Sequence, residues 1–377
     1  MKKLLRKLAN MSIRKTNRPK ALYIHIPFCN SICDYCDFTK LQYFTIFSKP
    51  YLKALKNEIK SYNIKDLDTI YIGGGTPTSL SDEEFEDLLQ FVFPYAKNIK
   101  EYTIECNPES LTQNKLKLMK EYGVNRLSIG VESTNDEILK SINRKHTWKD
   151  VVLAVKNARK EGFDNISLDL IIGLPNVTNK MFEKDIKNII DLNVDHVSCY
   201  SLTVHPNTVF YINGIEPLPS DQERELYDTV NENLVNNGFI KYEISSWSKG
   251  KESLHNLTYW RNQEYYGCGL GASGYVNGVR YKNISNIQKY LKGTCIEEKE
   301  EVSLKDNIEY EIMLNLRTRY GINLDFFKEK YNFDLFKEKE KEIQKLIKNN
   351  LMKIENNNLI ATYEGSMILD KLFLWLI

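Results

Sequence analysis

Apolar stretches typical of β-strands alternate with amphipathic stretches typical of α-helices along the first half of the chain. The strand pattern occurs six times, at residues 22–28, 69–73, 101–106, 126–131, 166–172 and 196–204. Helical patterns follow several of these strands, at residues 81–95, 111–122, 147–161 and 178–192. The SDEE run that begins at Ser81 fits a capping box, and Gly123 and Gly162 fit two helix ends. This order predicts a chain of βα units.

Six βα units in series predict a parallel sheet, which places the protein in the α/β class. Such a chain most simply curls into a partial TIM-type (β/α) barrel of about six repeats, which we assign to residues 21–240. An open, doubly wound sheet is the alternative. In a barrel, ligand-binding groups gather where the strands end.

The regular alternation ends after about residue 206. Residues 220–237 have a helical pattern, and a connecting region at 241–300 mixes turns with short strands. Residues 301–377 are mainly helical, with helical patterns at 305–319, 325–330 and 335–349, a hairpin that turns at 356–358 and a final apolar helix. Helices with a hairpin suggest a small winged-helix-like C-terminal domain. We expect its apolar last helix to dock this domain onto the rest of the chain.

The composition excludes some functions and leaves others open. Of 377 residues, 52 are Lys or Arg and 50 are Asp or Glu, so the net charge of +2 gives no indication of nucleic-acid binding. The basic N-terminal tail (1–20) lacks the continuous apolar segment of a signal peptide, and no apolar run is long enough to span a membrane. We therefore expect a cytoplasmic protein. Leu4, Leu5 and Leu8 share one helical face, which leaves open peripheral membrane contact, with a solvated tail as the alternative. A homodimer is also left open.

Three of the seven cysteines stand close together after the first predicted strand, in the run LYIHIPFCNSICDYCDFTK. Cys29, Cys33 and Cys36 have the spacing C-x3-C-x2-C, and thiolates at such a site select zinc, copper(I) or iron–sulfur clusters. A structural zinc site needs four ligands, and only His25 is a local candidate for the fourth. On a cluster of four irons, three thiolates leave one iron open to a small molecule. The other cysteines lack pairing spacings, so a disulfide scaffold is not expected.

The cysteine motif resembles the signature of the radical S-adenosylmethionine (SAM) superfamily. Other motifs follow in order: GGGTPTSL (73–80), IECNPE (104–109), RLSIGVES (126–133), LDLIIGLP (168–175), SLTVHPNT (201–208), YEIS (242–245) and HNLTYW (255–260). Together they resemble the oxygen-independent coproporphyrinogen III oxidase-like family, from about residue 20 to the C-terminus. The resemblance implies a 4Fe-4S cluster whose open iron binds SAM and whose electron cleaves SAM to a 5′-deoxyadenosyl radical.

The resemblance also implies a set of SAM-contacting residues. By motif position these are Tyr23, Tyr35, Gly74, Gly75, Thr76, Glu105, Glu132, Arg144 and Asp169. Their chemistry is suitable, because glycines allow close approach of the backbone, carboxylates accept hydrogen bonds, and a guanidinium can clamp a carboxylate. Glu132 departs from the family, which usually has Gln at this position, so an amide is exchanged for a carboxylate.

Phe38 marks the branch of the family to which this sequence is most similar. The oxidases have a fourth cysteine two positions after the third, where this chain has Phe38. The chain instead resembles the heme chaperone branch, which also carries the HNxxYW motif. This implies a protein that binds heme and passes it to a heme-accepting protein. The alternatives are a radical SAM enzyme that acts on coproporphyrinogen III or another substrate, and a non-catalytic zinc protein. No catalytic residue is assigned.

His255 is the candidate heme ligand, because a neutral imidazole suits iron and Tyr259 and Trp260 could pack against a porphyrin. The alternative is a buried hydrogen-bond cluster that joins the barrel to the C-terminal domain. Ser273 stands where the family often has histidine, which removes a second polar contact. Cys268, nearby in the sequence, is either a thiolate ligand or a small buried hydrophobe.

Overall fold

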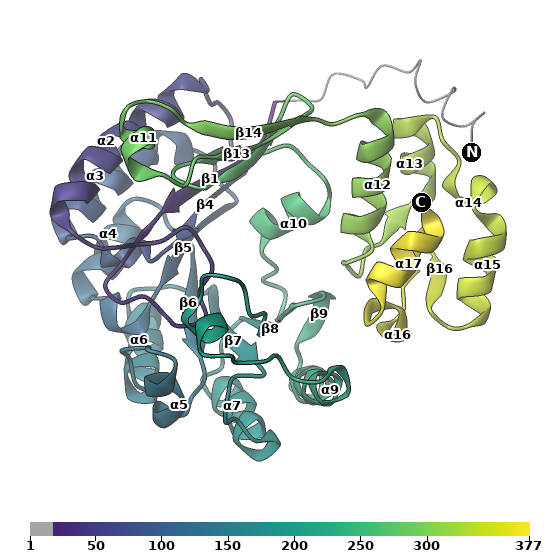
Figure 1. The fold of residues 1–377 in the computed structure, drawn as a ribbon, viewed down its shortest axis with the longest axis horizontal. Helices are drawn as coiled ribbons and strands as arrows, with labels where there is room; N and C mark the ends of the chain where they lie inside the picture. The colour runs from purple at the N-terminus through teal and green to yellow at the C-terminus, as the bar shows by residue number, and fades with distance from the viewer. Residues whose placement is uncertain (1–17) are drawn as a thin grey trace.

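The computed structural model describes residues 18–377, and the N-terminal tail with its leucines at positions 4, 5 and 8 lies almost wholly outside the described residues. Six consecutive parallel strands form the centre of a nine-stranded sheet in the described part of the chain (Figure 1). These are β1 (Ala21–Ile26), β4 (Thr69–Gly74), β5 (Glu101–Cys106), β6 (Arg126–Glu132), β7 (Ile166–Ile172) and β8 (His196–Ser201). They lie in the order β1-β4-β5-β6-β7-β8, each beside the next in the sequence of βα units. The predicted α/β class and the six-unit pattern are confirmed.

Both edges of this sheet come from the segment that follows the βα units. β11 (Tyr266–Cys268) pairs in parallel with β1, whereas β10 (Ser246–Ser248) pairs antiparallel with β8 and with β9 (Ile240–Glu243). In the described part of the chain the two edge strands, β11 and β9, do not pair with each other, so the sheet is a partial barrel. The boundary predicted at residue 240 falls inside this sheet.

The helices cover the outer face of the barrel (Figure 1). They include α2 (Thr45–Ser61), α3 (Asp82–Val92), α4 (Gln113–Glu121), α5 (Asp136–Ser141), α6 (Trp148–Lys160) and α7 (Asn179–Asp191). The capping box is present, since the Ser81 side chain accepts from the Glu84 backbone and the Glu84 carboxylate accepts from the Ser81 backbone. α3 turns Phe85, Leu88 and Leu89 toward the sheet, and these side chains are fully buried. Apolar residues spaced three and four positions apart thus lie on one face of the helix, and this face packs against the sheet.

A helix and a small sheet connect the barrel to the C-terminal domain. α9 (Ser220–Asn236) precedes β9, and α10 (Leu254–Trp260) lies between β10 and β11. The three-stranded sheet of β12 (Ser273–Val276), β13 (Val279–Asn283) and β14 (Ile296–Glu301), with α11 (Ile287–Leu291), then leads to the last domain.

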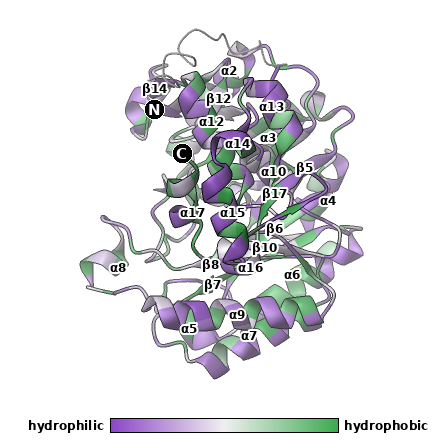
Figure 2. Ribbon diagram, turned by 90° about the vertical axis from the view of Figure 1, so that its right-hand side faces the viewer, coloured by the Kyte–Doolittle hydropathy of each residue, from purple (hydrophilic) through white to green (hydrophobic). Residues whose placement is uncertain are grey.

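The C-terminal domain has its own core and faces the viewer in Figure 2. It contains α12 (Leu304–Asn315), α13 (Leu324–Tyr331), α14 (Leu335–Glu338), α15 (Glu340–Lys348), α16 (Tyr363–Ser366), α17 (Leu369–Leu376) and a sheet of β15 (Ile322–Asn323), β16 (Met352–Glu355) and β17 (Asn358–Ala361). This combination matches the predicted winged-helix-like domain. No helix of residues 18–377 is long and apolar enough to cross a membrane.

The expected docking role of the last helix is wrong. Leu372 and Leu376 of α17 are buried in the core of the C-terminal domain itself, whereas Leu374 is 66% exposed. Contacts with the barrel side come from other parts of this domain, among them α16, where Glu364 pairs with Arg224 of α9 at 2.9 Å. The apolar residues of the last helix are needed to complete the small domain, so they are not available for docking.

Candidate functional site

A cavity of about 480 Å³ opens at the carboxyl ends of the parallel strands. The three clustered cysteines line it together with eight of the other ten predicted site residues. These eight are Tyr35, Gly74, Gly75, Thr76, Glu105, Glu132, Arg144 and Asp169. The remaining two, Tyr23 and His255, do not line this cavity. Strand ends that are far apart in the sequence therefore form a single site, as a parallel barrel requires.

The cysteines lie on the loop between β1 and α2. Two short parallel strands brace this loop, β2 (Phe28–Cys29) and β3 (Leu41–Gln42). Cys29 is buried and Cys33 and Cys36 are partly exposed, and all three thiols are free. The hydroxyl of Thr76 lies 3.6 Å from the Cys29 sulfur. Burial raises the pKa of Cys29 to about 11 and that of Cys36 above its ordinary value, so a raised pKa favours the protonated thiols in the metal-free protein. Metal binding requires thiolates, so both thiols must then release their protons.

Three thiols of one loop can supply three protein ligands to a cluster. A structural zinc ion binds four protein ligands at one atom. The thiolates of a cubane cluster bind different irons and need not meet at one point.

The glycine run brings β4 close to the cysteine loop. The Gly75 amide donates to the Ile26 carbonyl at 2.8 Å, and the Thr76 amide donates to the Phe28 carbonyl at 2.8 Å. A Cβ atom at Gly75 would lie 2.7 Å from the backbone of Pro27, closer than packed atoms allow. Gly74 has a φ of +108°, which side chains rarely adopt. Only glycine therefore permits this approach of backbone to the cluster loop.

Glu105, at the end of β5, is held by two donors. Its carboxylate accepts from the Tyr71 hydroxyl at 2.7 Å and from the Gly74 amide at 2.9 Å. Burial raises the pKa of Glu105, although both hydrogen bonds act to lower it. Tyr23 lies deeper, with its hydroxyl 2.9 Å from His25 and its ring 6.2 Å from that of Tyr71. Tyr23 thus does not line the cavity, and its ring lies near that of the lining residue Tyr71.

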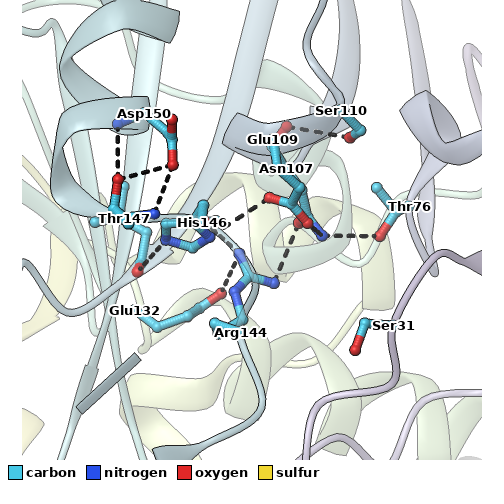
Figure 3. Close-up of polar contacts among 12 residues, drawn as sticks. Ser31, Thr76, Asn107, Glu109, Ser110, Glu132, Arg144, His146, Thr147 and Asp150 are labelled. Atoms are coloured by element: carbon cyan, nitrogen blue, oxygen red, sulfur yellow. Dashed lines mark hydrogen bonds and ion pairs between the residues drawn. The ribbon is translucent and has the colours of Figure 1, made fainter. Parts of the chain in front are cut away.

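Arg144 lies between the cysteine loop and two strand ends (Figure 3). Its guanidinium donates to Asn107 at 3.2 Å and to the Cys33 sulfur at 3.6 Å, and it lies 3.5 Å from the Glu132 carboxylate. It also donates to the Gly130 carbonyl. The Nε atom of Arg144 is buried and has no hydrogen-bond partner. A buried guanidinium with an open donor fits an incoming carboxylate.

Asp169, in the middle of β7, supplies a third acceptor to the cavity. Ser128 donates to it at 3.0 Å and Ser167 at 3.2 Å. Burial is the largest influence on Asp169 and raises its pKa, whereas its serine partners lower it. Asn107 was not among the site residues predicted from the sequence. Its side chain donates to Thr76 at 3.3 Å and accepts from Arg144. Asn107 lies within the IECNPE motif, so its position beside Glu105 was the available signal.

His255 lies at the opposite end of the barrel from the cysteines. Its Nδ1 is 2.9 Å from the Thr69 hydroxyl at the start of β4, and its Nε2 is 2.7 Å from the Tyr259 hydroxyl. Its side chain is fully buried, and the Tyr71 ring lies 5.2 Å away. Glu101, the first residue of β5, accepts from the backbone amide of His255 at 3.2 Å. In this conformation both ring nitrogens have partners, so neither is open to a heme iron.

The rest of the HNLTYW motif connects barrel and C-terminal domain. The Arg317 guanidinium of the C-terminal domain lies 4.4 Å from the centre of the Trp260 ring. Beyond the motif, Asn262 donates to Asn307 of α12 at 2.6 Å. The printed side-chain hydrogen bonds of His255 thus stay on the barrel side, and the motif meets the C-terminal domain through the stacking of Arg317 on Trp260, whose Nε1 has no hydrogen-bond partner. The hydrogen-bond cluster joining the two domains through this motif stays a prediction. Cys268 is fully buried as a small hydrophobe, and Ser273 lies exposed at the start of β12.

Two protein-family models match the chain. The Radical SAM superfamily matches residues 23–189, and the HemN C-terminal domain matches residues 302–368. The first range contains the cysteine loop and the eight predicted non-cysteine site residues that line the cavity, and the second covers most of the C-terminal domain.

Curated relatives match over nearly the whole chain. The chain is 41% identical to "Heme chaperone HemW" of Bacillus subtilis (strain 168), over 94% of this chain and 98% of that protein. It is 33% identical to "Heme chaperone HemW" of Escherichia coli (strain K12), over 79% of this chain and 82% of that protein. The solved structure of coproporphyrinogen III oxidase (HemN) from Escherichia coli has a TM-score of 0.83 at 21% identity, covering 100% of this chain and 93% of that chain. That likeness shows the fold alone.

Proposed function

Because this chain belongs to the heme chaperone branch of the radical SAM superfamily, we propose that it binds heme and transfers it to an acceptor protein. The observation that carries the proposal is the 41% identity to a curated heme chaperone over almost the full length of both chains. The cofactors that follow from this membership are a 4Fe-4S cluster and SAM. Phe38 supports the chaperone branch, because it stands at the position of the fourth cysteine of the oxidases.

The residues around the cavity suit these cofactors. Cys29, Cys33 and Cys36 hold the cluster in this proposal, and Arg144 directs its unpartnered Nε to the SAM carboxylate. Glu105 and Asp169 supply acceptors for amine or hydroxyl groups. When bound, the cluster and SAM supply one-electron chemistry. The chain itself orients the ligand and limits water, since the cavity walls are strand ends and partly buried side chains.

A heme titration tests the proposal. Protein with its cluster rebuilt under anaerobic conditions is titrated with heme, and the spectrum is followed in the Soret region. We expect a saturable Soret band at a stoichiometry of one, followed by transfer of heme to an added apo-hemoprotein. A protein that carries its cluster but produces no saturable band overturns the proposal.

We further propose a cytoplasmic location and one heme-accepting protein partner, with no nucleic-acid partner. The near-neutral net charge of +2 supports the last point. Homodimer formation and peripheral membrane contact through the basic tail stay as predictions. Light scattering across a range of concentrations tests the first, and co-sedimentation with anionic vesicles tests the second.

A further inference from the structure

The imidazole of His205 is far more exposed than those of the other four histidines. Residues 18–377 contain all five histidines of the protein. His25, His146, His196 and His255 are at most 4% exposed, whereas the His205 side chain is 46% exposed. A heme iron needs a ring nitrogen that it can reach. On accessibility alone, His205 is therefore the histidine best placed to bind iron without unfolding part of the barrel.

His205 lines the same cavity as the three clustered cysteines. It lies on the loop between β8 and α8 (Val209–Ile212), and its Nε2 is 3.4 Å from the Asp37 carboxylate, next to Cys36. The loop has a defined shape, because the Thr208 hydroxyl donates to the His205 carbonyl at 2.7 Å. The imidazole therefore faces the cysteine loop across the cavity mouth.

Exposed apolar and aromatic side chains line the same cavity or lie on the helix that follows His205. Phe38 lines the cavity and is 64% exposed, and Tyr200 lines it and is 45% exposed. Tyr211 and Ile212 of α8 are 57% and 75% exposed, and α8 projects from the body of the protein in Figure 2. Phe210 anchors α8, because its amide donates to the Asp34 carbonyl at 3.1 Å. Exposed apolar groups gathered at a cavity mouth indicate a ligand with an apolar surface.

We propose that heme binds across this mouth, with His205 Nε2 as an axial ligand of the iron and the Phe38 and Tyr200 side chains against the porphyrin. This inference rests on the proposed function and places the heme beside the cluster, at the opposite end of the barrel from His255. On binding, the proton that Nε2 directs at the Asp37 carboxylate is lost to solvent and Nδ1 carries the one proton of the neutral ring, so that the Nε2 lone pair forms the bond to iron and the contact with Asp37 is given up. No electron is transferred in this step.

A set of four variants tests the site, each with its cluster rebuilt and titrated with heme. We expect His205→Gly to lose the spectrum of histidine-ligated heme and to regain it when free imidazole is added. We expect Phe38→Ser to weaken heme binding by about tenfold, the loss expected when one large apolar side chain no longer packs against the ligand. Phe326→Ser is the matched control, because Phe326 is 60% exposed in the C-terminal domain. His255→Gln should leave the heme spectrum unchanged.

The outcomes separate this inference from the proposed function. If the unaltered protein binds no heme, the proposed function fails. If it binds heme and His205→Gly keeps both the spectrum and the affinity, the His205 site is excluded. Loss of the spectrum in His255→Gln, with a normal cluster content, would place the heme at the floor of the barrel instead and overturn the inference. A loss in Phe326→Ser equal to that in Phe38→Ser would also overturn it.

Discussion

The Glu132 carboxylate lies 3.5 Å from the Arg144 guanidinium, and the backbone of Glu132 is left-handed, with a φ of 64°. Among the described residues, every other residue with positive φ is Gly, Asn or Asp. A left-handed conformation costs about 1–2 kcal/mol for a residue of this type. The pairing in β6 is irregular between Gly130 and Glu132, and this irregularity directs the carboxylate toward Arg144. The strained backbone conformation thus occurs at Glu132, one of the two charged residues that pair in the cavity.

Replacing Glu132 with Gln should strengthen SAM binding. The Glu132 carboxylate pairs with the guanidinium that we assign to the SAM carboxylate, so the two carboxylates compete. Glu132→Gln keeps the size of the side chain and removes this competition, and we expect the dissociation constant of SAM to fall about fivefold, equivalent to about 1 kcal/mol. Equilibrium dialysis of cluster-loaded protein measures it, with the exposed Glu137→Gln as control. Weaker SAM binding in Glu132→Gln would mean that the carboxylate itself contacts SAM.

The clustered cysteines should be individually essential for the cluster. Cys29→Ala, Cys33→Ala and Cys36→Ala each remove one thiolate, and two ligands do not hold a four-iron cluster firmly. We expect each variant to lose most of its iron and acid-labile sulfide after anaerobic reconstitution. Cys295→Ala, which changes a partly exposed cysteine of another region, should keep both. An equal loss of iron and sulfide in the Cys295 variant would show that the loss reflects general damage to the protein and not the removal of a cluster ligand.

The protein should not oxidise coproporphyrinogen III. Phe38 stands where the oxidases have their fourth cysteine, and the curated relatives described above are heme chaperones. We expect anaerobic incubation with reductant, SAM and coproporphyrinogen III to give no decarboxylated product by mass spectrometry. The Escherichia coli oxidase serves as the positive control. If product forms at a rate comparable to that of the control enzyme, the protein is an oxidase and this prediction is wrong.

His255 should matter for stability. Its ring joins Thr69 of the barrel to Tyr259 of α10, and the whole side chain is buried. We expect His255→Ala to lower the free energy of unfolding of the cluster-free protein by roughly 2–4 kcal/mol, because the buried Thr69 hydroxyl and the partly buried Tyr259 hydroxyl each lose a partner. Urea denaturation measures this change. His205→Ala, at an exposed position, should change it by less than about 0.5 kcal/mol. Equal effects in the two variants would contradict the assigned structural role.

The contribution of Lys241 to the free energy of unfolding should increase as the solution becomes alkaline. Its amine lies between the rings of Tyr227 and Tyr363, at 4.9 and 5.0 Å, and burial lowers its pKa to about 8. An unfolded lysine has a pKa of about 10.4, so between these values the unfolded chain binds a proton that the folded chain lacks. Stability from this group therefore increases as the pH rises through that window and is constant below about pH 8.

A paired variant isolates this effect from other titrating groups. Lys241→Gln has no titrating amine, so the difference in unfolding free energy between wild type and variant should change by roughly 1–3 kcal/mol between about pH 7.5 and about pH 9.5. Urea denaturation of the cluster-free proteins at both values measures this difference. A difference that does not depend on pH would show that the folded-state pKa of Lys241 is not lowered.

Local patterns in the sequence were sufficient for the βα units. Alternating and four-residue periodicities placed six strands and most helices, because each element shows its buried face in the order of its own residues. The cysteine spacing and the glycine run likewise identified the cluster loop and the strand that approaches it. Glu105 and Arg144 were assigned to the site by motif resemblance. Glu105 is near the carboxyl end of β5, where a parallel barrel gathers its ligand groups, whereas Arg144 lies between α5 and α6 and reaches the site only in the folded chain.

Only the tertiary structure revealed the contacts between segments that are far apart in the sequence. His255 is 186 residues from Thr69, and only the folded chain shows that the two form a hydrogen bond at the floor of the barrel. The pairing of β11 with β1 and of β10 with β8, and the burial of one side of α17 within its own domain, were also not predicted from the sequence. Periodicity reveals which face of an element is apolar but does not identify its partner, because that partner comes from a distant segment. The burial that closes His255, and the exposure that leaves His205 open, both depend on such distant contacts.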